Sequence, residues 1–152
     1  MIYLAADHRG FRLKEILKRF LSEELHLPLV DVGAHEQDLY DDYVDFAESA
    51  LDVMAKDPAN HKGIFICGSG HGMDMVANKY KGIRAALGFN ADVARQSREH
   101  ENTNVLVLPS DWLNEDEAKK IVKVWLESEF SGVDRHIRRV DKISAVEEEN
   151  FK

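Results

Sequence analysis

Residues 67–72 read Cys-Gly-Ser-Gly-His-Gly, so every second residue of this short segment is glycine. The glycines leave backbone N–H groups uncovered, and a helix beginning at this turn adds the positive end of its dipole. Such a turn can stabilise an anion, and we expect it to depress the pKa of Cys67 so that the thiolate can act as a base. Neither a Walker lysine nor a dinucleotide fingerprint is present. Taken alone, the segment fits equally well a tight turn that holds a buried structural cysteine.

Other polar residues that could do chemistry occur in three short clusters. Asp7-His8-Arg9-Gly10 follows the first apolar segment, and His100 opens a second cluster just before the last apolar segment. In the third cluster Arg135 and Arg139 are four residues apart, so on a helix they share a face and could bind a phosphate through their guanidinium groups. A solvated helix face is the alternative for that cluster. No H-x-E or H-E-x-x-H pattern occurs, so we predict no metal site.

The elements that must position these residues alternate along the chain. We expect strands over 2–6, 29–32, 62–67, 83–89 and 104–108, and helices over 11–25, 42–55, 73–80, 91–100, 115–129 and from 134 onward. This alternation predicts an α/β fold, a parallel five-stranded sheet with helices on both faces. Ligands of such sheets bind beyond the carboxyl ends of the strands. We therefore expect the polar clusters, that of His100 included, to meet at that edge.

Composition limits the classes of function. The chain has 152 residues, 44% hydrophobic and 32% charged, which fits one domain over residues 1–152. A net charge of −8 argues against nucleic acid and anionic membranes as partners. Cys67 is the single cysteine, so no intrachain disulfide or cysteine zinc cluster can form, and a reducing cytoplasm is expected. No segment has the length of a signal-peptide core or a membrane span.

Five segments in order resemble the ribose-5-phosphate isomerase B / galactose-6-phosphate isomerase family over nearly the whole chain. They read ADHRGF, Asp42-Tyr43, ICGSGHGMDMVANKYKGIRAAL, ARQSREHENTNVLVL and GVDRHIRRV. The resemblance implies a flavodoxin-like, three-layer αβα sandwich that isomerises a phosphorylated sugar between aldose and ketose without a metal or organic cofactor. It also implies a homodimer, or a dimer of dimers, with active sites shared between subunits. The helix at about 134–150 would then reach the partner.

The same resemblance implies roles for individual residues. Cys67 would be the base that moves a proton between C1 and C2 through an enediolate, and Ser69 would hydrogen-bond the sugar oxygens and shuttle a proton between them. Backbone N–H groups of residues 68–72 would stabilise the enediolate, and Asp7 and His100 would help to open the furanose ring. The implied substrate-binding residues are His8, Tyr43, Gly68, Gly70, His71, Gly72, Glu101, Arg135 and Arg139, with His8 and the two arginines on the phosphate.

Two positions depart from the family pattern. Glu101 stands where the family usually has an asparagine that donates to a substrate oxygen, and Asp111 stands where an arginine commonly helps to bind phosphate. A carboxylate at either place would repel the negative charge it faces. Met73 occupies the position of a glutamate base in some relatives, and Asp74 could raise the pKa of Cys67 if it faced inward.

Three hypotheses stay open on these grounds. The first is an isomerase that interconverts ribose 5-phosphate and ribulose 5-phosphate. The second is an isomerase of a different sugar or sugar phosphate, and the third is a non-catalytic module that binds sugar phosphates.

Overall fold

Five parallel strands form one sheet in a structure, a computed structural model, that describes residues 1–151. In order across the sheet they are β2 (Leu29–Asp31), β1 (Ile2–Ala6), β3 (Lys62–Cys67), β5 (Val105–Pro109) and β4 (Ala85–Leu87). The central strands β1, β3 and β5 are apolar because both of their faces are covered. The predicted parallel five-stranded sheet is therefore confirmed, and its order differs from the flavodoxin order by an exchange of the last two strands.

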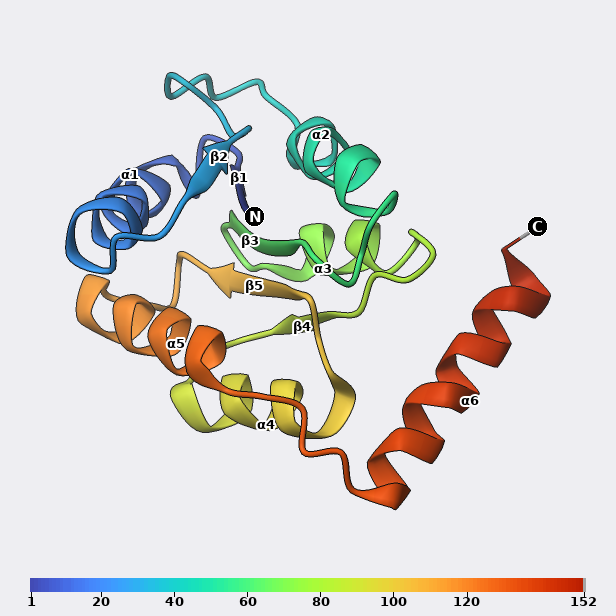
Figure 1. The fold of residues 1–152 in the computed structure, drawn as a ribbon. Coiled ribbons are helices and arrows are strands. Elements are labelled where there is room, and N and C mark those ends of the chain that lie inside the picture. Colours follow the sequence, from blue (N-terminus) through green and yellow to red (C-terminus); the bar gives the residue numbers. More distant parts are fainter. Residues whose placement is uncertain (152) are drawn as a thin grey trace.

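Helices cover both faces of the sheet (Figure 1), which confirms the three-layer arrangement. One face carries α1 (Phe11–Arg19), α4 (Ala91–Glu101) and α5 (Glu115–Glu127); the other carries α2 (Tyr43–Met54) and α3 (His71–Ala77). The helix predicted over 11–25 is α-helical only to Arg19 and continues as a π-helical turn, η1 (Phe20–Glu24). The helix predicted over 73–80 begins earlier, because Gly70 takes a left-handed conformation (φ 80°) and starts α3 directly after the glycine turn.

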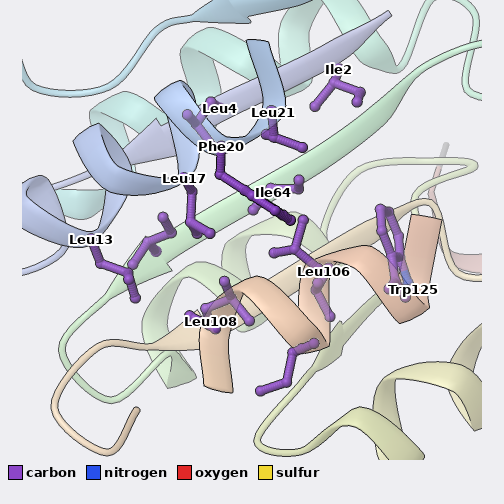
Figure 2. Close-up of a cluster of buried hydrophobic side chains, with 14 of the residues drawn as sticks. Ile2, Leu4, Leu13, Leu17, Phe20, Leu21, Ile64, Leu106, Leu108 and Trp125 are labelled. Carbon is purple, nitrogen blue, oxygen red and sulfur yellow. The ribbon is translucent and has the colours of Figure 1, made fainter. Parts of the chain in front are cut away.

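The core consists of two hydrophobic clusters, one on each face of the sheet. Successive strand residues point to opposite faces, so Leu4 and Ile64 join the cluster under α1 and α5, whereas Phe65 and Cys67 join the cluster under α2 and α3. Figure 2 shows the first cluster, in which fully buried Trp125 of α5 lies at one end. The two clusters thus hold the central strands in place from both faces. The polar turns at the carboxyl edge of the sheet follow directly on these strands.

The last helix, α6 (Asp134–Asn150), lies outside the three layers (Figure 1). His136 is its one buried residue. Ile137, Ile143 and Val146 are exposed in the single chain, so α6 leaves several apolar side chains without a partner. Near its other end the carboxylate of Glu147 accepts a hydrogen bond from the Gly82 amide at 3.1 Å. Within residues 1–151, none of the helices combines the length and apolar character needed to cross a membrane.

Candidate active site

Cys67 ends β3 at the point where strand order reverses, between the carboxyl ends of β1 and β5. Its side chain is almost completely buried, and the backbone amides of Gly70, Gly72 and Met73 lie near its sulfur and favour the thiolate. These amides belong to the first turn of α3 and to the turn before it, and α3 has no side-chain cap. The thiol thus takes the place that a capping side chain takes at α5, where Asn114 accepts from the Glu117 amide.

The expectation that this turn depresses the pKa of Cys67 is wrong for the single chain. Burial raises the pKa of the thiol, and the three amides, which favour the thiolate, offset only part of that rise. The carboxyl of Asp7 adds a smaller upward contribution to the Cys67 pKa. Asp7 therefore has the effect that the sequence suggested for Asp74. The side chain of Asp74 lies beside His71 and Asn78 instead.

The side chains of Tyr43 and Arg9 pack directly against the glycines of the turn, and we call them the walls of the site. A Cβ at residue 72 would lie 2.5 Å from Cε2 and 2.8 Å from Oη of Tyr43, which stands at the start of α2. A Cβ at residue 68 would lie 2.6 Å from Nε of Arg9. Glycine is therefore required at both positions for Tyr43 and Arg9 to approach the backbone this closely. Cys67 lies between them at the base of what we call the cradle, residues 67–73 with these two walls.

The turn between β1 and α1 holds Asp7 and His8 in different ways. Asp7 is buried, and its Oδ1 accepts hydrogen bonds from the amides of Arg9 at 3.1 Å and Gly10 at 3.0 Å. Burial raises the pKa of Asp7, although these amides oppose the rise. His8 turns toward the loop before α2, where its Nδ1 lies 2.6 Å from Oδ1 of Asp41 and its amide donates to the same oxygen at 3.0 Å. Asp41 thereby fixes the orientation of the imidazole.

The side chains of Asp7, His8 and Asp41 form the only group of three or more His, Cys, Asp and Glu residues, within 1–151, whose donor atoms lie close enough to hold a metal ion, all within 4.8 Å of one another. Two of these oxygens are already occupied: Asp7 Oδ1 by backbone amides and Asp41 Oδ1 by His8. Asp41 Oδ2 is buried and has no hydrogen-bond partner among residues 1–151. The prediction that the site works without a metal remains a prediction.

The turn after β5 is hydrogen-bonded to the backbone of the cradle. Ser110 Oγ donates to the carbonyl oxygens of Cys67 and Arg9, each at 3.1 Å, and the Asp111 amide donates to the Gly68 carbonyl at 3.0 Å. The Asp111 carboxylate forms an ion pair with Arg9. Asp111, expected from the sequence to repel a phosphate, is therefore partly neutralised by a guanidinium group.

His100 does not lie at this edge, and the expectation that all polar clusters meet there is wrong. His100 is in the last turn of α4, which leads into the amino end of β5, whereas Cys67 pairs with Pro109 at the carboxyl end. A residue before a parallel strand and a residue after its neighbour lie at opposite edges of the sheet. The His100 ring stacks on that of His136 in α6, with ring centroids 4.2 Å apart.

Other predicted residues divide between the two edges. Ser69 and His71 belong to the cradle turn, where Ser69 Oγ accepts from the His71 amide at 3.3 Å. Glu101 lies beside His100 and lines a groove between β4 and α6. Arg135 and Arg139 are exposed in the first turns of α6, close to His136. The predicted residues thus form two separate groups in one chain: the cradle with Asp7, His8 and Tyr43, and the α4–α6 cluster, defined as His100, Glu101, Arg135, His136 and Arg139.

Three residues around the cradle received no role from the sequence: Arg9, Asp41 and Ser110. Arg9 belongs to the polar cluster of Asp7 and His8, and only these two neighbours were given roles. No local sequence pattern pointed to Asp41 or Ser110, because their contacts are distant in the chain. Asp41 lies 33 positions from His8, and Ser110 lies 43 positions from Cys67 and 101 from Arg9.

Comparisons with known proteins find relatives that match almost the whole chain. A family model described as Ribose/Galactose Isomerase matches residues 2–143. A probable ribose-5-phosphate isomerase B of Mycoplasma genitalium is 42% identical over 148 residues, which are 97% of this chain and 96% of that protein. A putative sugar phosphate isomerase of Bacillus subtilis is 37% identical over 150 residues, 99% of each protein.

Solved structures match equally well. The crystal structure of ribose-5-phosphate isomerase B from Mycoplasma genitalium with bound ribulose-5-phosphate has a TM-score of 0.93 and 42% identity, covering 98% of this chain and 97% of that one. The corresponding enzyme of Clostridium thermocellum has a TM-score of 0.90 and 38% identity, covering 97% of each chain. Sequence and fold agree, and the chain belongs to the ribose/galactose isomerase family.

Proposed function

We propose that this chain interconverts ribose 5-phosphate and ribulose 5-phosphate, with Cys67 as the base. It is an aldose–ketose isomerase of sugar phosphates by family, and its similarity to the Mycoplasma genitalium enzyme that holds ribulose-5-phosphate supports the pentose substrate. The observation that carries the role of Cys67 is the set of three backbone amides that face its sulfur at the switch point of the sheet. Such donors favour the thiolate without adding a competing base.

The reaction balances with the groups of the cradle. The Cys67 thiolate takes the proton from C2 of the open-chain aldose, which leaves an enediolate, and the resulting thiol returns the proton to C1. The Ser69 hydroxyl carries the hydroxyl proton from O2 to O1, so the aldehyde becomes an alcohol and C2 becomes the ketone. Uncovered amides of residues 68–72 that do not face the sulfur would stabilise the charge on the enediolate.

The phosphate and the ring-opening step require residues from a second copy of the chain. His100, Arg135 and Arg139 belong to the α4–α6 cluster at the opposite edge of the sheet from Cys67. In a homodimer, the α4–α6 cluster of one subunit would face the cradle of the other and supply the imidazole and two guanidinium groups. The exposed Ile137, Ile143 and Val146 of α6 support burial of this helix against a partner.

The test compares wild type with Cys67→Ala and Cys67→Ser in the conversion of ribose 5-phosphate to the ketose. Loss of the base should lower kcat by about 10²–10⁴-fold with intact folding, checked by circular dichroism. Because Cys67 is the only cysteine, alkylation with iodoacetamide at a pH alkaline enough to form the thiolate should inactivate wild type, and substrate should protect it. Equal turnover by wild type and Cys67→Ala would exclude Cys67 as the base. Assays with hexose 6-phosphates and with unphosphorylated ribose then define the substrate range.

A further inference from the structure

The Arg9 side chain extends across the active edge of the sheet. Arg9 follows β1, its side chain crosses Gly68 at the end of β3, and its guanidinium group meets Asp111 after β5. Since β1, β3 and β5 are neighbours in the sheet, this one side chain spans the ends of the three central strands. We propose that Arg9 is a phosphate-binding residue of the active site and that Asp111 holds its guanidinium group in position.

The position of the guanidinium group is set by the cradle itself. Carbon and nitrogen atoms of the Arg9 side chain lie 2.6–3.0 Å from the place where a Cβ of residue 68 would be, so the side chain rests directly on the glycine backbone. Ser110 ties the Arg9 backbone to that of Cys67, and the Asp111 amide is bonded to the Gly68 carbonyl. Hydrogen bonds thus connect the backbone of Arg9, that of the base and that of the carboxylate partner of Arg9.

The ion pair leaves Arg9 free to bind an anion. Its Nη2 contacts Asp111, and the other N–H donors of the guanidinium fork are not used by that contact. The Arg9 side chain is 56% exposed, so an incoming group can reach it, and an ion pair this exposed adds little to folding stability. A phosphate monoester carries about two negative charges near neutral pH and accepts several hydrogen bonds, which matches a fixed fork beside the base.

The obvious competing role for the pair is a latch that only ties two turns together. The two roles predict different changes in phosphate affinity when Arg9 or Asp111 is substituted. If Arg9 binds phosphate, removing its charge weakens phosphate binding, whereas Asp111→Asn removes a repulsive charge, keeps an oxygen that can hold the guanidinium group, and strengthens phosphate binding. If the pair is only a latch, breaking it from either side has the same effect.

The experiment measures binding of inorganic phosphate to the purified full chain by isothermal titration calorimetry, with KM and kcat for ribose 5-phosphate beside it. Arg9→Gln should weaken phosphate binding roughly tenfold or more and raise KM by a similar factor, whereas Asp111→Asn should tighten phosphate binding by about twofold to fivefold. Arg9→Lys keeps a charge for Asp111 but lacks the fork, and should fall between Arg9→Gln and wild type.

Arg12→Gln is the matched control. Arg12 is exposed and borders the same hollow of about 360 Å³ beside Arg9, but it contacts neither Gly68 nor Asp111. It should leave phosphate affinity unchanged within about twofold, which excludes a general effect of net charge. Equal weakening by Arg9→Gln and Asp111→Asn, or no effect of Arg9→Gln, would overturn the proposal.

This inference rests on the proposed function, yet the two fail separately. A wild type that binds phosphate through Arg9 but converts no pentose phosphate would refute the function and keep the anion site. A wild type that converts ribose 5-phosphate with the same phosphate affinity as Arg9→Gln would refute only the role of Arg9. The thermal midpoints of all variants, compared with that of wild type, show whether a lost affinity reflects lost folding.

Discussion

Two inactive variants of this chain should restore each other's activity when they are mixed. Cys67 pairs with the carboxyl end of β5, whereas His100 precedes its amino end. Along β5 the rise from Val105 to Pro109 alone is about 13 Å, and direct proton transfer needs groups within about 3 Å. Both residues can therefore serve one substrate only if they come from different copies. Cys67→Ala and His100→Ala each remove one of these groups from every site.

The size of the recovery follows from counting sites. Random pairing of equal amounts makes about half of the dimers mixed, and each mixed dimer has one site with both groups intact and one with neither, so about a quarter of wild-type activity per chain should return. A dimer of dimers gives the same fraction if each site uses one pair of chains. The assay follows ketose formation from ribose 5-phosphate after co-expression of the two variants, with each variant alone as the baseline.

Ser69→Ala mixed with Cys67→Ala is the matched control, because both residues belong to the same cradle. Each site of such a mixed dimer lacks either the base or the hydroxyl, so activity should stay at the baseline. Native mass spectrometry establishes that mixed dimers have formed. Mixed dimers of Cys67→Ala and His100→Ala that remain inactive would refute the shared site, and so would the control pair if it recovered.

Three further predictions follow from the packing of the chain. Because burial raises the pKa of Cys67, kcat/KM should rise by about tenfold per pH unit through the neutral range, and a pH profile that is flat there would contradict a buried thiol base. Gly70→Ala places a Cβ at φ 80° against Leu87 and should lower the unfolding free energy, measured in urea, by about 1–2 kcal/mol more than Gly132→Ala, whose Cβ at φ 64° would meet nothing. Buried Lys14 pairs with Asp31 at 2.7 Å, so Lys14→Met should cost about 3 kcal/mol at pH 7. Burial alone would raise the pKa of Asp31, but its hydrogen bonds lower it, so this cost is present above the usual carboxyl pKa and should shrink as acid protonates Asp31; a cost constant with pH would refute the pairing.

Most of the fold could be predicted from local patterns. The apolar runs of β1, β3 and β5 and the helical spacing of α2 and α5 match the expected ranges to within two residues. The differences lie where local pattern is weakest: the π-helical turn η1 continues the apolar stripe of α1, and the start of α3 depends on the conformation of Gly70. The exchange of β4 and β5 in the sheet concerns pairing between strands, which periodicity does not report.

For the candidate site, the sequence predicted which residues carry the chemistry but not at which edge of the sheet each of them lies. The glycine turn, Cys67 and Asp7 meet at the carboxyl edge as expected, because each directly follows a parallel strand. His100 was misplaced because it precedes its strand, and strand direction alone puts it at the other edge. The contact between Arg9 and Asp111 joins residues 102 positions apart, so no local pattern contains it.

Residue order alone was sufficient to identify a parallel α/β sheet and a turn able to favour an anion, since periodicity and glycine spacing act over a few residues. The resemblance of five segments to a family of sugar isomerases was also readable from the sequence. The packed chain decided the rest. Burial, which depends on every neighbour, reversed the expected shift of the Cys67 pKa. The sheet placed the α4–α6 cluster away from the cradle, because side chains at opposite ends of parallel strands cannot meet within one copy of the chain.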